Sequence, residues 1–345
     1  MSKPSWRLVA LALVGLGGLA LVARVRWSPA RLMHQSVLAD ARASATLPLN
    51  SRLGAGQGLG GRWLGLDRQA GGTVTDAEAW LERQLGGPRL ETLSFDTQRL
   101  GQPGAVPVEG LLITPPGAPP TVLLYLASSG VSRGPGLDAE ALAIYRRFDP
   151  PRRILVLPLP CAQQRGAGWP SLATADVLVL ERMARQAALD LARADYACRG
   201  AGWRVEALGG FSLGGCFAAA ASGLRPDLWA DVDLYLWGAG GDLDTLARQS
   251  THGLADQLRP PPGSSRRAWR RRLTQLDPLT HAARGRLARA VLVGGRTDSI
   301  MPPACVEALA RELRRSGAQV RLDWVDGGHL ATIGAPPALT RWFAW

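Results

Sequence analysis

Apolar runs and helical stretches alternate from residue 120 onward, and this alternation constrains the fold more than any other feature of the chain. We expect strands at 121–126, 154–157, 204–208, 232–237, 290–294 and 320–325, and helices at about 137–148, 172–196, 213–224 and 303–316. Strands that are apolar throughout are typical of parallel strands buried on both faces. Joined by helical crossovers, they predict an α/β fold with a doubly wound, mostly parallel sheet.

The rest of the chain adds segments before and within this sheet. Strand-like runs at 90–95 and 106–113 surround the turn-prone segment GQPG at 101–104 and predict a β-hairpin. About 50 residues separate the strands ending near 237 and starting near 290, which is more than a crossover needs. We interpret residues 239–287 as a small helical cap over the carboxyl edge of the sheet. Residues 90–345 then form one domain, a size that α/β folds reach.

The segment before this domain has two parts. Residues 28–89 are first rich in glycine and arginine without a sustained period, and then hold a short helix that starts at the capping-box pair Thr75 and Glu78. We interpret them as a linker and N-terminal arm.

Residues 1–27 contain a membrane signal. Positions 8–23 are 16 consecutive apolar or glycine residues with basic residues on both sides. A membrane span needs about 20 residues, which interfacial tryptophans at 6 and 27 and snorkelling arginines would supply. A cleaved secretory signal is the alternative, although Leu21 occupies a position at which signal peptidase requires a small residue. We favour an uncleaved single-helix anchor over an exported protein or a buried helix. The basic residues on the two sides of this segment balance, so they do not indicate on which face of the membrane the domain lies.

Composition narrows the function classes. The hydrophobic content of 46% with 20% charged residues excludes a disordered chain. The net charge of +12 would suit nucleic acid or an anionic membrane. However, Lys3 is the only lysine among the 40 basic residues, which indicates an arginine-rich genome background, and no nucleic-acid-binding motif accompanies the charge. We therefore expect no nucleic-acid partner.

Two further groups of residues have ordinary explanations. The four cysteines, Cys161, Cys198, Cys216 and Cys305, are scattered without a CxxC motif, so we expect no metal site, and whether Cys161 and Cys198 pair is open. We expect Cys216 to be structural. The segment RRAWRRR at 266–272 could meet phosphate headgroups or an anionic substrate, but a solvated helix face is the commoner outcome.

The segment GFSLGG at 210–215 is the sharpest motif, because it lies between an expected strand and an expected helix. A serine in such a tight turn adopts a strained backbone, and side chains at 210 and 214 would clash with the strand and helix. The helix N-terminus also places backbone N–H groups beside Ser212, the first of them that of Leu213, where a developing oxyanion needs donors. A bare GxSxG pattern is weak in a chain with 41 glycines, but this context indicates a nucleophile.

A serine nucleophile needs a base, and the chain has four histidines. His329 follows the last expected strand, so it should lie at the same sheet edge as Ser212. His34 lies near the membrane segment, and His252 and His281 fall in the expected cap and its exit, where a solvated histidine is the simpler explanation. We predict His329 as the base.

The base in turn needs a carboxylate to orient it. Asp298 comes just after the strand expected at 290–294, again at the carboxyl edge. Of the competing acids, Asp323 lies within a strand and Asp326 can simply shape the turn before the histidine. We predict Asp298 as the orienting acid.

The order Ser212, Asp298, His329 on a doubly wound sheet resembles the α/β-hydrolase superfamily over about residues 90–345. The segment GFSLGG and the compact single domain are most similar to the dienelactone hydrolase and acyl-esterase branches of this superfamily. The resemblance implies a second oxyanion donor in the loop after residues 121–126, where we choose Ser129, with Ser128 as the alternative. Many members carry His-Gly there, whereas this chain has Ala127-Ser128.

The motifs and the resemblance together predict a serine hydrolase acting on a small-molecule or lipid-like acyl ester, without metal or organic cofactor. An acyltransferase or thioesterase with the same three residues is the enzymatic alternative. A non-catalytic, membrane-anchored module that keeps the fold is the alternative of another class.

Overall fold

The computed structural model describes residues 52–55, 88–100, 104–128, 140–141, 144–145, 147–148, 151–160, 177–261 and 263–334. The expected anchor at 8–23 and the short helix expected after residue 75 lie outside these residues. Within the part of the chain that is described, no helix is long and apolar enough to cross a membrane.

One nine-stranded sheet organises the chain, in the order β1-β2-β3-β5-β4-β6-β7-β8-β9. The strands are β1 Arg52–Ala55, β2 Arg89–Gln98, β3 Ala105–Thr114, β4 Thr121–Leu126, β5 Ile154–Leu157, β6 Arg204–Phe211, β7 Asp233–Trp237, β8 Arg289–Gly295 and β9 Gln319–Val325. The strands from β5 to β9 pair in parallel, and β1, β2 and β3 are antiparallel. The predicted α/β fold with a mostly parallel sheet is confirmed. Strand β1 adds an edge strand from the segment that we interpret as a linker and arm.

The strand order fixes where a site can form. From β4 the chain crosses to β5 on one side, whereas from β6 it crosses to β7 on the other. Connections that leave two neighbouring strands in opposite directions open a crevice beyond their carboxyl ends. The residues that follow β4 and β6 therefore face each other at this crevice.

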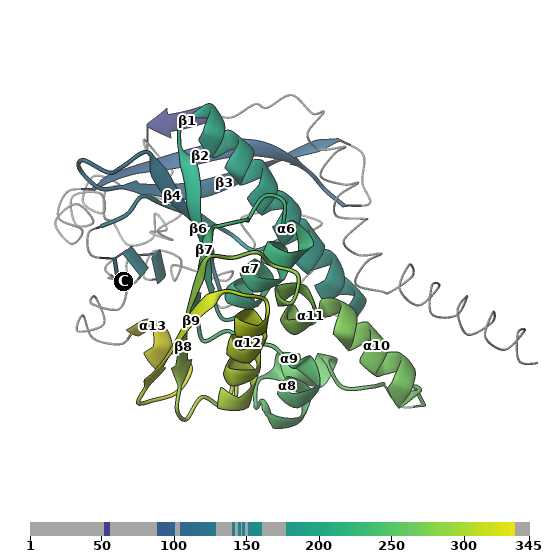
Figure 1. Ribbon diagram of the computed structural model, residues 1–345. Coiled ribbons are helices and arrows are strands. Elements are labelled where there is room, and N and C mark those ends of the chain that lie inside the picture. Colours follow the sequence, from purple (N-terminus) through teal and green to yellow (C-terminus); the bar gives the residue numbers. More distant parts are fainter. Residues whose placement is uncertain are drawn as a thin grey trace, which may run out of the picture.

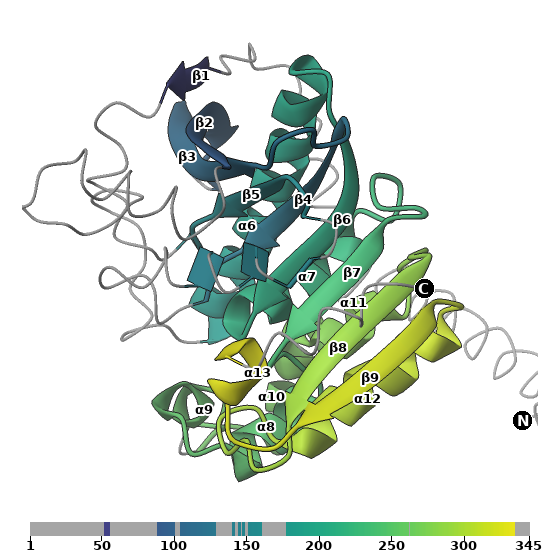
Figure 2. The same ribbon diagram turned by 90° about the vertical axis from the view of Figure 1, so that its left-hand side faces the viewer.

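Helices cover both faces of the sheet (Figures 1 and 2). On one face lie α6 Val177–Gly200, α7 Leu213–Leu224 and α12 Pro303–Arg315, with the larger apolar core beneath them. On the other face, the smaller core contains the described residues of 140–148 and packs against α13 Ala331–Gly334. The sheet is therefore doubly wound. Strands β4, β5, β7 and β8 are buried on both sides as their composition predicts, whereas the edge strand β9 is mostly half-buried.

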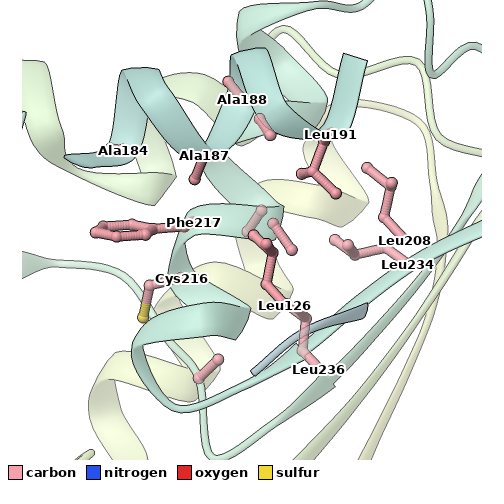
Figure 3. Packing of buried hydrophobic residues seen from close by; sticks show 14 of the residues in the cluster. Leu126, Ala184, Ala187, Ala188, Leu191, Leu208, Cys216, Phe217, Leu234 and Leu236 are labelled. Atoms are coloured by element: carbon pink, nitrogen blue, oxygen red, sulfur yellow. The ribbon is translucent and has the colours of Figure 1, made fainter. Parts of the chain in front are cut away.

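Small side chains let α7 pack deep in the larger core. Ala184, Ala187 and Ala188 of α6 face α7, while leucines of β4, β6 and β7 close the space on its sheet side (Figure 3). Phe217 is the large side chain that α7 contributes between these layers. Because α7 begins directly after Ser212, this packing holds the motif at 210–215 in place.

The expected cap region is helical, as predicted. It contains α8 Leu243–Gln249, α9 Gly253–Gln257, α10 Arg266–Leu276 and α11 Pro278–Ala282. Only part of this region lies over the carboxyl edge of the sheet, where a cap is expected. Helix α10 packs against α6 and α8, and α11 packs against α7 and α12, so these two extend the helical layer on one face of the sheet.

Candidate active site

Ser212 lies in a strained turn between β6 and α7. Its backbone has φ 56° and ψ −125°, a conformation that L-residues rarely adopt. A Cβ at Gly210 would lie 2.5 Å from the carbonyl carbon of Gly214, and one at Gly214 would lie 2.3 Å from the carbonyl oxygen of Leu126. Both glycines are therefore required by close backbone approach, as the motif indicates.

His329 and Asp298 are hydrogen-bonded at the carboxyl ends of β9 and β8. Asp298 Oδ2 lies 2.7 Å from His329 Nδ1, and both side chains are buried. The other carboxylate oxygen, Oδ1, accepts hydrogen bonds from the backbone N–H groups of Ile300 and Met301, each at 2.9 Å. The His329 ring stacks on Phe211, the residue before Ser212, at 4.9 Å between centroids. The carboxylate and the imidazole are thus held rigidly.

The second ring nitrogen, Nε2 of His329, is buried and has no hydrogen-bond partner among the described residues. A carboxylate can only accept, so in the neutral imidazole Nδ1 carries the proton and Nε2 keeps a lone pair. Ser212 and His329 line the same pocket, but no hydrogen bond joins Ser212 Oγ to Nε2 in this structure. Such bonds are often long before substrate binds. The arrangement offers a proton acceptor beside a serine hydroxyl.

That pocket has a volume of about 240 Å³ and is mostly apolar. Its walls come from α6, α7, α8, α9 and the end of α10, together with the segment around Ile300 and Met301. Ser212 and His329 therefore open onto a partly open apolar pocket rather than onto flat surface.

Comparisons with solved structures find matches over most of the chain. An acetyl xylan esterase from a Thermoanaerobacterium species superposes with a TM-score of 0.54 at 11% identity, over 86% of this chain and 88% of that one. An acylaminoacyl peptidase from Pyrococcus horikoshii gives 0.52 at 13% identity over 76% of this chain, which spans only 41% of the peptidase. The chain has the α/β-hydrolase fold. Comparisons with protein-family models and with curated proteins find no match.

In the α/β-hydrolase fold of this chain, the loop after β4 meets the start of α7. The predicted oxyanion donors are Leu213 at the start of α7 and Ser129 after β4, with Ser128 as the alternative. The N–H of Ser128 donates to Glu140 Oε1 at 2.9 Å, so it is already used. Ser129, our preferred donor, lies outside the described residues.

Glu140 is a buried residue that sequence reasoning missed. Its Oε1 accepts from Tyr125 Oη at 2.7 Å and its Oε2 from Ser128 Oγ at 2.6 Å. Burial raises the pKa of Glu140 to about 7, although these hydrogen bonds lower it in part. The acid falls within the helix expected at 137–148, where the pattern gives no sign that it points inward.

The competing acids lie elsewhere in the structure. Asp323 pairs with Arg321 at 2.7 Å, and the exposed Asp326 pairs with Arg296 at 3.1 Å. Neither bonds His329 in the described structure.

The other histidines differ in their exposure to solvent. His252 is exposed and lines the pocket rim. His281 is fully buried, with Nε2 2.7 Å from the carbonyl oxygen of Gln275, so our expectation of a solvated side chain was wrong. The reason is that α11 packs directly against α7. His34 lies outside the described residues.

The cysteines and the arginines of residues 266–272 are the remaining residues that the sequence analysis singled out. Cys198, Cys216 and Cys305 are buried and free, and Cys161 lies outside the described residues. Cys216 also lines the pocket, and its thiol contacts the carbonyl oxygen of Gly240 at 3.4 Å. The arginines of α10 are exposed, whereas Trp269 is buried and donates to the carbonyl oxygen of Leu258 at 2.7 Å. Helix α10 is therefore anchored by its tryptophan and presents a basic outer face.

Proposed function

We propose that this chain is a serine hydrolase that cleaves a carboxylic ester through an acyl-enzyme on Ser212. The observation that carries the proposal is the unpartnered, buried Nε2 of His329, held by Asp298 beside a serine in a strained strand-to-helix turn. Strained serines and oriented imidazoles are the two parts that an acyl-transfer site needs.

The residues divide the reaction between them. His329 Nε2 takes the proton of Ser212 Oγ as the oxygen attacks the ester carbonyl, and Asp298 stabilises the imidazolium that forms. The N–H of Leu213, at the positive end of the α7 dipole, donates to the oxyanion, and Ser129 supplies the second donor. His329 then protonates the leaving alcohol. In the second half, His329 takes a proton from water as the water oxygen attacks the acyl carbon. The bond from that carbon to Ser212 Oγ then breaks, His329 returns the proton to Oγ, and the acid is released.

The test is covalent labelling with a fluorophosphonate probe, which reacts with activated serines. The wild-type protein is expected to be labelled, and Ser212→Ala is expected to abolish labelling. Ser250→Ala is the matched control, since Ser250 also lines the pocket but its hydroxyl donates to the carbonyl oxygen of Ile300. It should be labelled like the wild type. A folded wild-type protein that is neither labelled nor active on short esters would overturn the proposal.

A further inference from the structure

The pocket beside Ser212 has a chemical character that goes beyond the presence of a nucleophile. Helices α6, α7, α8 and α10 contribute the large apolar side chains Leu180, Phe217, Leu246 and Leu276, and Leu258 lies just after α9. Of the described residues that line it, none is an aspartate, glutamate, lysine or arginine. The polar lining comes from the serines and histidines that include Ser212 and His329.

This lining selects against charge. A charged group placed among these leucines would lose its hydration without gaining a partner, which is costly. The volume of about 240 Å³ is also below the roughly 300–1,000 Å³ of sites that hold drug-sized ligands. The space therefore suits a slender, uncharged apolar chain.

We propose that this pocket binds the unbranched apolar chain of an ester of medium chain length, and that the residues on α8 and α9 set the length. The inference rests on the proposed function, because it places the ester carbonyl at Ser212. Each methylene that enters the pocket should raise kcat/KM about fourfold until the pocket is filled. Longer chains should then react more slowly.

The experiment is a chain-length profile on the full chain in two arms. One arm varies the acyl group of p-nitrophenyl esters from acetyl to palmitoyl, and the other varies the alcohol of acetate esters. We expect one arm to rise by about fourfold per methylene and then to fall, which identifies the side of the ester that enters the pocket. Profiles that are flat in both arms, from a protein whose Ser212 is labelled, would overturn this inference and leave the proposed function standing.

Variants of the pocket wall sharpen the test. Ala255 lines the pocket on α9, so Ala255→Phe should move the optimum to shorter chains. Leu246→Ala enlarges the pocket and should move it to longer ones. Ala283→Phe is the control, because Ala283 is exposed and does not line the pocket, and it should leave the profile unchanged. An optimum that stays in place in both wall variants would contradict the assignment.

A second, independent observation concerns Glu140, whose three hydrogen bonds come from the end of β4. The carbonyl oxygens of Leu126 and Ala127 lie so close to Gly214 that a Cβ there would be 2.3 and 2.4 Å from them. The end of β4 is thus in contact with the start of α7, next to Ser212. A side chain that fixes the end of β4 therefore also helps to fix the start of α7, next to Ser212.

We infer that Glu140 is a positioning residue that holds Ser128 and the end of β4 in place beside the start of α7, where the N–H of Leu213 is the proposed oxyanion donor. Glu140 accepts hydrogen bonds from the N–H and the hydroxyl of Ser128. Its buried carboxyl also ties Ser128 to Tyr125 within the strand. This inference too rests on the proposed function, since it concerns the oxyanion site of the same reaction.

The test compares kcat and KM in Glu140→Ala and Glu140→Gln. Displacing an oxyanion donor by about 1 Å can cost roughly 100-fold, so Glu140→Ala should lower kcat by about that factor with little change in KM. Glu140→Gln keeps an acceptor for the Ser128 N–H and should restore most of the loss. Glu206→Ala, which removes an acid paired with Arg152 elsewhere on the sheet, is the control. A folded Glu140→Ala protein with the kcat of the wild type would overturn the inference, whereas absence of Ser212 labelling in the wild type would overturn the proposed function instead.

Discussion

Replacing Asp298 with asparagine is expected to lower kcat by roughly 10⁴-fold without unfolding the protein. The structure gives the reason. Oδ1 of Asp298 accepts from two backbone N–H groups, so the amide oxygen of asparagine must occupy that position. The amide NH₂ then faces His329 Nδ1, where Oδ2 now lies. Because NH₂ can only donate, Nδ1 must become the acceptor and the proton moves to Nε2, which then has no lone pair for the serine proton.

The measurement is steady-state kinetics on a short ester, together with thermal unfolding of both proteins. Asp323→Asn is the matched control, because Asp323 is a nearby acid on β9 that pairs with Arg321 and does not bond the histidine. It should keep kcat within about twofold. An Asp298→Asn protein with more than a tenth of the wild-type kcat would show that Asp298 does not set the tautomer of His329.

Ser212, Asp298 and His329 could be placed from the sequence because each follows a predicted strand of the sheet. Parallel strands bring their carboxyl ends to one edge of the sheet, so three positions far apart along the chain converge without any knowledge of loop structure. The need for glycine at 210 and 214 could be predicted for a similar reason, since a close backbone approach explains their spacing around Ser212. These features depend on strand direction and sterics, which a single sequence contains.

Glu140 and His281 could not be placed in this way. Whether an acid on a helix turns inward depends on what faces it, and the partners of Glu140 are Tyr125 and Ser128, 15 and 12 residues earlier in the chain. His281 is buried because of how α11 meets α7, a contact between segments whose packing no local pattern encodes. The length of the region after β7 indicated additional helices, but their position on the sheet follows from tertiary packing alone.

The contact between α7 and α11 leads to the largest expected effect on stability. Gly223 is the point of closest approach, where a Cβ would lie 1.7 Å from the carbonyl oxygen of His281 and 2.3 Å from its carbonyl carbon. Both atoms belong to the backbone, so no side-chain rotation can relieve the clash. We expect Gly223→Ala to lower the free energy of unfolding by about 3 kcal/mol or more, because α11 must move away from α7 and open the core around both helices.

Gly253→Ala provides the matched control for this prediction, measured by denaturant unfolding of both variants. A Cβ at Gly253 would meet nothing within 4 Å and the backbone needs no positive φ, so alanine there should be neutral or stabilising by up to about 1 kcal/mol. A loss below about 1 kcal/mol in Gly223→Ala would show that α11 can shift cheaply. The pocket gives a second readout, since Pro278 at the start of α11 and Leu276 at the end of α10 both line it. If α11 moves away from α7 as the clash requires, the chain-length optimum of any residual folded enzyme should broaden, which links the packing of α7 to the selectivity of the site that it supports.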